Sequence, residues 1–403
     1  MDATTLNRKL MMGYQGWFAY PGDRSPLNRW LHWFRNNSPD ASSLTIDMWP
    51  DTRELPAEEM LATRMNHSDN RAAALYSAYN SSTVARHFKW MQDNNLDGVM
   101  LQRFTSELRD PAFRSFRDQL TKNVQAGAEA HGRVFCVMYD ISGSNESTLV
   151  EDLKSDWANL VDTLKITDSS MYLRHKGKPL LAIWGLGFTG RPGTSTQAKE
   201  IITHFKSGAP AQYQATLLGG VPSNWRTLNG DSKTEAAWTD IYKSFDVLSP
   251  WSVGRYADDA GADNFRKNLV AGDLKQLSAA GIDYMPVIFP GFSWRNLNNG
   301  PLNQVPRRGG RFWWRQLYNA VSSGCTMIYC AMFDEVDEGT AMFKLVADKQ
   351  DLPAQAQDRL VYLNIDGEIL SNDWYLRVAD QGGKMLRGEI NLTRSLPITP
   401  VKP

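Results

Sequence analysis

Eight short apolar runs alternate with helix-like segments along this chain, and that alternation limits the possible folds more than any other feature. The runs are continuously apolar rather than alternating apolar and polar, which indicates strands buried on both faces, as in parallel sheets. They lie at 11–18, 97–104, 134–143, 179–188, 215–221, 247–254, 284–294 and 327–335.

The segments between these runs have the periodicity of helices. In 84–91 and in 149–164 the apolar side chains recur every three or four residues and fall on one stripe. Eight strands that alternate with helices in a chain of 403 residues predict an α/β fold, a single (β/α)8 TIM barrel.

We expect one catalytic domain over residues 1–403, with long loops at the C-terminal face of the strands. The first crossover, 19–82, is long and loop-rich, and we expect it to form part of the mouth of the barrel. The segment 359–386 is expected to form a small hairpin that closes with the last helix.

Composition excludes several classes of protein. The chain has 44 basic and 44 acidic side chains, which argues against a partner that is a nucleic acid or an anionic membrane surface. No apolar run approaches the ~20 residues of a membrane-spanning helix. We therefore expect a soluble monomer, either cytoplasmic or exported with its leader absent from this chain. The three cysteines lie in or beside apolar runs and are expected to be buried thiols.

Four carboxylates follow the last apolar run within "AMFDEVDEGT": Asp334, Glu335, Asp337 and Glu338. Like charges so close together repel one another, so a structural reason for gathering them is lacking. In barrel enzymes the active site is built at the C-terminal ends of the strands. The position of the cluster after the eighth strand therefore makes it a candidate site.

Glu335 and Glu338 are three positions apart, and a helical turn would place their Cβ atoms roughly 5–6 Å from each other. Cleavage of a glycosidic bond with retention of configuration needs two carboxyl groups about 5–5.5 Å apart. Mutual repulsion raises the pKa of one carboxyl, which sorts such a pair into proton donor and base. A magnesium or calcium site is the alternative for the same residues.

Other polar and aromatic residues also stand at strand ends or in neighbouring loops, where flat sugar rings could stack. Aromatic residues make up 11% of the chain. For any single Trp a place in the core is the alternative, and of the seven candidate sugar platforms, Trp17, His32, Trp33, Trp184, Trp251, Tyr256 and Trp294, we expect roughly half to be core. Asp140 could instead cap a helix, and Arg103 could form a structural ion pair. The candidates for substrate binding are Tyr14, Trp17, His32, Trp33, Asp47, Gln102, Arg103, Asp140, Trp184, Trp251, Arg255, Tyr256, Trp294, Asp334 and Asp337.

Cofactor motifs are missing from the sequence. No two of the six histidines have zinc-ligand spacing, and there is no P-loop, nucleophile elbow or strand-linked G-x-G-x-x-G. We expect no cofactor and no metal.

Several segments together resemble the glycoside hydrolase family 71/99-like proteins, which are related to the family 99 endo-α-mannosidases. The resemblance covers most of residues 11 to 345. The segments are "GYQGWFAYPGD", "WLHWF", "DMWPD", "LQRF", "VMYDISG", "LSPWSVGRY", "PGFSW" and "FDEVDEGTAMFK". The active-site segment of family 99 is similar to N-E-W-H-E-G-T, and "DEVDEGT" matches it at both glutamates, Gly339 and Thr340. Asp334, Val336 and Asp337 stand where that family has Asn, Trp and His.

The resemblance implies a (β/α)8 barrel and retaining cleavage of a glycoside. It implies that Glu335 deprotonates the sugar's own 2-hydroxyl, which attacks the anomeric carbon and gives a 1,2-anhydro sugar. Glu338 then protonates the leaving oxygen and later activates water. Our prediction from the sequence is a retaining glycoside hydrolase acting on an oligo- or polysaccharide. The alternatives are a non-catalytic carbohydrate-binding barrel and a metal-assisted hydrolase that uses the acidic cluster.

Overall fold

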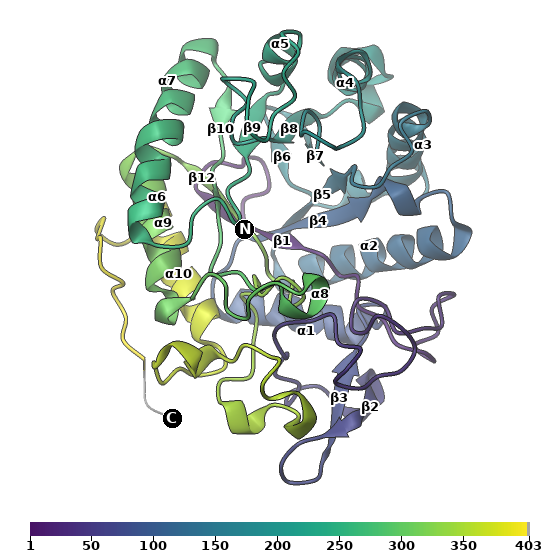
Figure 1. The fold of residues 1–403 in the computed structure, drawn as a ribbon. Helices are drawn as coiled ribbons and strands as arrows, with labels where there is room; N and C mark the ends of the chain where they lie inside the picture. Colours follow the sequence, from purple (N-terminus) through teal and green to yellow (C-terminus); the bar gives the residue numbers. More distant parts are fainter. Residues whose placement is uncertain (401–403) are drawn as a thin grey trace.

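The structure is a computed structural model that describes residues 1–400. Within these residues a mostly parallel sheet curls into a barrel, and Figure 1 looks along it with the helices surrounding the strands. The barrel strands are β1 (Lys9–Tyr14), β4 (Gly98–Phe104), β5 (Val134–Asp140), β7 (Lys178–Trp184), β8 (Thr216–Val221), β9 (Val247–Pro250), β10 (Asp283–Tyr284), β11 (Val287–Ile288) and β12 (Met327–Cys330).

The sheet closes through one segment, 283–288, that is split into two short strands. Its first half, β10, pairs with β9, and its second half, β11, pairs with β12. Pro286 lies between the halves and has no N–H to donate, but its carbonyl accepts from Tyr329 N at 3.0 Å. Counting this segment as one strand, residues 1–400 give the predicted eight barrel positions in the predicted order, so the (β/α)8 fold is confirmed.

Each barrel strand is followed by a helix on the outside of the sheet. The outer helices are α1 (Ser81–Asp93), α2 (Pro111–His131), α3 (Leu149–Asp162), α4 (Ser195–Thr203), α5 (Trp238–Tyr242), α6 (Asp259–Phe265), α7 (Ala271–Ala280), α9 (Arg311–Ser322) and α10 (Trp374–Arg387). Helix α2 shows why such helices begin and end where they do. Asp110 caps its first N–H groups, Pro111 opens it, and Gly132 ends it in the left-handed conformation at φ 59°.

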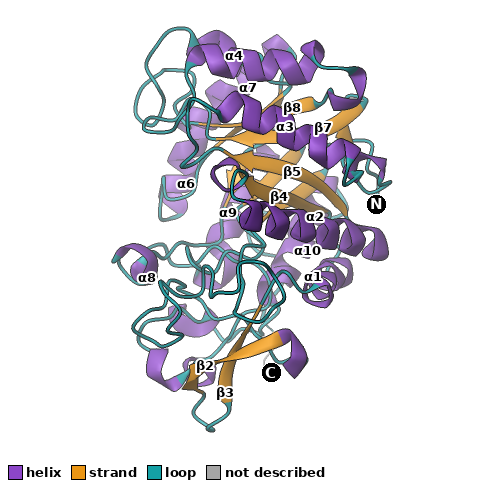
Figure 2. Ribbon diagram, turned by 90° about the vertical axis from the view of Figure 1, so that its right-hand side faces the viewer, coloured by secondary structure: helices purple, strands orange, loops and turns teal. Residues whose placement is uncertain are grey.

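Two long connections form a lobe beside the barrel. The connection after β1 contains an antiparallel hairpin of β2 (Met60–Asn66) and β3 (Ala72–Tyr76), which projects below the barrel in Figure 2. It meets the connection between β12 and α10 through a bridge of Pro50 with Leu345. A further short pair, β6 (Arg174–His175) with β7, lies at the edge of the barrel.

The prediction of a hairpin within 359–386 is wrong. Residues 359–373 form turns, with a short 3-10 helix at Leu363–Asp366, and only α10 follows them. The reason lies in where the polar groups of the segment are bonded. Asp366 accepts from Arg308 N at 2.7 Å and from Asn303 Nδ2 at 2.8 Å, so the segment is tied to another loop rather than to itself.

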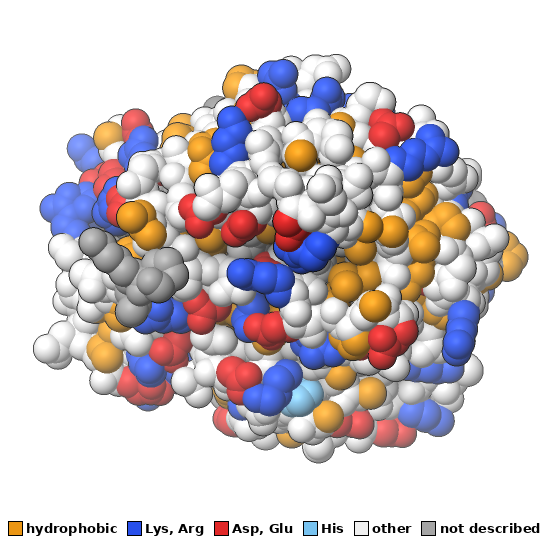
Figure 3. Space-filling model, turned by 90° about the horizontal axis from the view of Figure 1, so that it is seen from below, with side chains coloured by type: hydrophobic (Ala, Val, Ile, Leu, Met, Phe, Trp, Pro, Cys, Tyr) orange, Lys and Arg blue, Asp and Glu red, His pale blue; other side chains and the backbone are white. Residues whose placement is uncertain are grey.

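Buried apolar side chains form one continuous cluster that extends from Leu6 to Leu386. Acidic and basic side chains are interspersed over the face in Figure 3. Within residues 1–400, no helix has both the length and the apolar character needed to cross a membrane.

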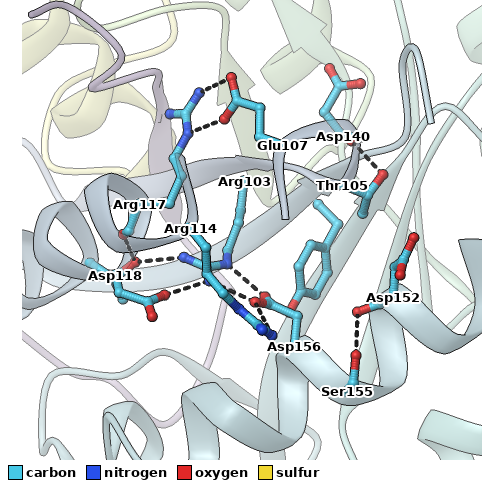
Figure 4. A network of polar contacts seen from close by, with 12 residues as sticks. Arg103, Thr105, Glu107, Arg114, Arg117, Asp118, Asp140, Asp152, Ser155 and Asp156 are labelled. Atoms are coloured by element: carbon cyan, nitrogen blue, oxygen red, sulfur yellow. Dashed lines mark hydrogen bonds and ion pairs between the residues drawn. The ribbon is translucent and has the colours of Figure 1, made fainter. Parts of the chain in front are cut away.

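A buried ion-pair network fixes α2 and α3 against β4 and β5 (Figure 4). The Arg103 guanidinium donates to both oxygens of Asp156 at 2.6 Å and to Asp118 at 2.6 Å. Tyr139 donates to Asp156 at 2.7 Å. Arg103 and Asp156 are almost fully buried, whereas the Asp118 side chain is 24% exposed.

Replacing Asp156 should therefore cost far more stability than replacing Asp118. Asp156→Ala leaves a buried guanidinium without its main partner, and we expect a loss of about 3–5 kcal/mol. Asp118→Ala removes a partly solvated pair and should cost about 1 kcal/mol or less. Urea unfolding followed by circular dichroism measures both values, and equal losses would contradict this account of the network.

Candidate active site

A cavity of about 550 Å³ opens at the C-terminal ends of the strands. This volume lies in the range of small-molecule sites in enzymes. Its floor and walls come from loops and strand ends far apart in sequence. The lining residues are Gln15, Trp17, Gln102, Phe104, Met138, Asp140, Ser142, Trp184, Arg191, Trp251, Val253, Gly254, Arg255, Phe292, Trp294, Gln304, Tyr329, Met332, Glu335 and Glu338.

Asp334 fixes the start of the acidic segment. Its two carboxylate oxygens accept the backbone N–H groups of Gln15 and Gly16, both at 2.8 Å. The exit of β12 is thereby tied to the exit of its neighbour β1. Both oxygens of Asp334 are occupied by these hydrogen bonds in the protein interior, and its side chain does not line the cavity.

Glu335 follows and turns its carboxyl group into the cavity. One oxygen accepts from Gln15 Nε2 at 2.7 Å and the other accepts from Thr340 Oγ1 at 2.8 Å. The backbone N–H of Thr340 also donates to the carbonyl of Glu335, which closes the turn. These contacts hold the carboxyl in one orientation.

Glu338 is positioned through its backbone, and its side chain is left free. Ser293 N donates to the Glu338 carbonyl at 2.9 Å. The next residue, Gly339, has φ 67°, and a Cβ there would lie 3.0 Å from Ser293. Glycine is therefore required at 339 for both conformation and space. The Glu338 carboxyl, half-buried in the cavity wall, has no hydrogen bond to residues 1–400.

Burial dominates the electrostatics of this segment. It raises the pKa of Glu335 well above its usual range, helped by the negative charges of Glu338 and Asp337 and opposed by the bonds from Thr340 and Gln15. Burial, Asp337 and Asp140 raise the pKa of Glu338 to about 8, and Arg191 opposes this rise. Such interacting carboxyls titrate as a group.

Asp337 points away from the cavity and faces His32. Its Oδ2 lies 3.5 Å from His32 Nδ1, while its Oδ1 is buried without a partner among the described residues. Burial raises the pKa of Asp337 to about 8, and burial together with Arg117 lowers the pKa of His32 to about 3. His32 in turn stacks flat on Trp17 at 3.8 Å, so this pair supports one aromatic wall of the cavity from behind.

Nine of the residues singled out from the sequence line the cavity together. They are Trp17, Gln102, Asp140, Trp184, Trp251, Arg255, Trp294, Glu335 and Glu338. Gln102 also donates to Tyr329 Oη at 2.9 Å on the cavity floor. Asp140 accepts from Ser142 N at 2.7 Å, in the manner of a turn cap, while still facing the cavity.

The remaining candidates lie outside the cavity lining. Tyr14 donates to or accepts from His87 in the core, Trp33 donates to Tyr76 O, and Arg103 belongs to the ion-pair network. Strand geometry explains why Arg103 lies outside the cavity. Successive side chains of a strand point to opposite faces, and its neighbour Gln102 points to the cavity side.

Asp47 and Tyr256 are also placed behind the cavity, as are His32, Asp334 and Asp337. Asp47 accepts from the backbone N–H groups of Arg295 at 2.7 Å and Asn296 at 2.8 Å. It thus holds the loop that carries Trp294 and the short helix α8 (Arg295–Asn298). Tyr256 donates to Gln316 at 3.0 Å among aromatic neighbours.

The sequence interpretation missed several lining residues, of which Gln15, Arg191 and Tyr329 bear most on chemistry. Gln15 stands at the end of β1 beside the chosen Tyr14, and the strand alternation would have favoured it. Tyr329 lies inside the apolar run of β12, where nothing in the sequence marks it as polar and accessible. Arg191 lies in the loop after β7, with no local motif.

Within residues 1–400 no group of three His, Cys, Asp or Glu side chains is arranged so that it could hold a metal ion. The cysteines Cys136, Cys325 and Cys330 are buried free thiols.

The (β/α)8 fold is similar to that of solved glycoside hydrolase structures. The endo-α-mannosidase of glycoside hydrolase family 99 from Bacteroides thetaiotaomicron, in complex with bis-tris propane, superimposes with a TM-score of 0.66 over 96% of this chain and 99% of that one, at 15% identity. A second structure of that enzyme gives 0.64 over 95% and 99%, also at 15% identity. A glycoside hydrolase-like protein gives 0.53 over 82% and 91%, at 12% identity.

At these identities the likeness is one of fold. No family model matches the sequence, and no curated protein matches it.

Proposed function

We propose that this protein is a glycoside hydrolase that cleaves a glycosidic bond in an oligo- or polysaccharide with retention of configuration. The observation that carries the proposal is the pair of carboxyl groups, Glu335 and Glu338, that face one aromatic-lined cavity from a single turn of the chain. Two close carboxyls flanking the scissile bond are the machinery that most glycosidases use.

The surroundings of the two glutamates differ in a way that suits two roles. Glu335 receives two donors, from Gln15 and Thr340, which favour its negatively charged form. Glu338 has no such donor, and its pKa of about 8 keeps it protonated at neutral pH. Burial raises the pKa of Glu335 as well, so the two donors are what distinguish the groups, and on that ground we assign Glu335 as the base and Glu338 as the acid.

The reaction follows from these roles and from the family resemblance. Glu335 takes the proton of the sugar 2-hydroxyl while O2 attacks the anomeric carbon. The bond from that carbon to the leaving oxygen breaks, and Glu338 gives the leaving oxygen its proton. Glu338 then removes a proton from water, which opens the 1,2-anhydro sugar, and Glu335 returns its proton to O2.

The rest of the cavity suits a carbohydrate. Trp184, Trp251 and Trp294 offer flat apolar faces, and Gln102 and Asp140 offer hydrogen bonds. Sugar rings need this combination because they have one apolar face and a rim of hydroxyl groups. Trp17 also lines the cavity, but it is buried and its ring stacks on His32 and Phe104.

We expect Glu335→Gln and Glu338→Gln each to fold normally and to lose on the order of 10² or more in kcat/KM, the usual scale for a lost base or acid. Reducing-end release from a panel of oligo- and polysaccharides measures this. Above about pH 8 the wild-type rate should fall, because Glu338 loses its proton. Glu338→Gln should lack this limb and should retain more activity on aryl glycosides, whose leaving groups need no acid.

Glu129→Gln is the matched control, since Glu129 is exposed on α2, outside the cavity lining. Full activity of both active-site variants on natural glycans would contradict the proposal. A natural oligosaccharide that stays intact across the carboxylates of the wild type in crystals would indicate a binding protein instead.

The first-formed product should retain its anomeric configuration, and no covalent bond between sugar and protein should form, because the nucleophile is the substrate's own O2. A 2-deoxy-2-fluoro glycoside lacks that oxygen and should be nearly inert. Proton NMR of the first anomer and intact-mass measurement after incubation with the fluoro sugar check both points. An inverted first product would require room for a water between the carboxyls, ~6.5–9.5 Å apart. A stable adduct on Glu335 would make that residue the nucleophile.

A further inference from the structure

Part of the cleft lining comes from elements other than the acidic turn and has a different chemistry. It is formed by Trp184, Arg191, Trp251 and Arg255, which we call the arginine–tryptophan wall. These residues come from the ends of β7 and β9 and the loops that follow them. In the sheet, β5 and β4 separate β7 from β1 and β12, which carry Gln15 and the glutamates.

The tryptophans of this wall are fixed in place by the strand between them. Trp184 packs over Gly220 of β8 so closely that a Cβ there would lie 2.4 Å from the indole ring. Trp251 then meets Trp184 edge-on, with ring centres 5.3 Å apart and planes at 71°. The result is a rigid aromatic corner that faces the cavity.

Arg191 lies over this corner with its charge unpaired. Its guanidinium carbon is 5.4 Å from the centre of the Trp184 ring. Among the ion pairs and side-chain hydrogen bonds of residues 1–400, none involves this guanidinium, and the residue is exposed. Asp140 and Glu338 feel its positive charge but form no ion pair with it.

Arg255 is held at a fixed position by an ion pair with Asp231, which offsets part of its positive charge. It donates from Nη2 to Asp231 at 2.7 Å. Asp231 is itself held by the backbone N–H groups of Ser223 and Asn224, each at 3.0 Å. An arginine has five N–H donors, so most of those on Arg255 stay available to a ligand.

We propose that the arginine–tryptophan wall binds the anionic group of an acidic glycan, a uronate carboxylate or a sulfate ester, while the sugar ring stacks on the tryptophans. The guanidinium fork matches the oxygens of both groups, and the aromatic corner takes the apolar face of the ring. This inference rests on the proposed function for the identity of the ligand as a glycan. It adds the substrate class, which the catalytic pair alone does not specify.

Binding of simple sugars tests the wall without any catalytic step. The protein is titrated with glucuronate, galacturonate and the 6-sulfates of glucose and galactose, and binding is measured by the change in its intrinsic tryptophan fluorescence. The comparison ligands are glucose, galactose and the methyl esters of the two uronates, which keep the ring and remove the charge. We expect acids of one kind, carboxylate or sulfate, to bind about tenfold or more tightly than their neutral counterparts, with affinity falling as salt rises.

Arg191→Gln should remove this preference, and Arg191→Lys should restore part of it by keeping the charge without the fork. Arg377→Gln is the matched control, because Arg377 lies 5.5 Å from Trp374 in the same manner but away from the cleft. Equal binding of charged and neutral sugars, absence of binding by all of them, or unchanged preference in Arg191→Gln would overturn the inference. A protein that prefers acidic sugars yet hydrolyses no glycan would support the wall and contradict the proposed function.

Discussion

The site depends on one buried carboxylate, that of Asp334. Its oxygens accept two successive N–H groups, those of Gln15 and Gly16, and so join the ends of β12 and β1. The turn that carries the two glutamates begins at this junction, and Gln15 reaches Glu335 from it. Burial raises the pKa of Asp334 to about 7, which the two N–H donors oppose. Burying the Asp334 carboxylate is unfavourable in itself, but its two hydrogen bonds fix the geometry of the turn.

Two parts of the cleft lining differ in their chemistry. The glutamates, with Asp140 and Asp337 nearby, raise one another's proton affinity and store protons close to neutral pH. The arginine–tryptophan wall holds two tryptophans and two arginines. A glycan lying between them would meet acid and base at one ring and aromatic faces with positive charge at another. The Asp47 contacts beside Trp294 and the pair of His32 with Asp337 behind Trp17 hold these parts of the cleft in shape before any ligand arrives.

The barrel could be predicted from the sequence because its strands are buried on both faces and read as continuous apolar runs. The β2–β3 hairpin could not, since strand β2 is partly exposed and mixes Thr, Arg and Asn with its apolar residues. The sequence predicts that the site lies at the ends of the strands. Which of two adjacent residues at a strand end faces the cavity depends on the alternation of side chains along the strand. Gln102 and Arg103 differ for that reason alone. Arg191 and Tyr329 acquire their roles from contacts between segments far apart in sequence, which no local pattern records.

The central claim is that Glu335 and Glu338 form a coupled pair in which Glu335 carries the negative charge and Glu338 keeps its proton. Carbon-13 NMR of protein labelled at the glutamate carboxyl carbon, with Glu335→Gln and Glu338→Gln to assign the signals, measures this directly. Burial raises the pKa of both groups, so both signals should titrate above the usual range. The account predicts that the donors from Gln15 and Thr340 let Glu335 ionise before Glu338, which stays protonated until near pH 8. Independent titration of both groups near pH 4.5, or ionisation of Glu338 before Glu335, would contradict it.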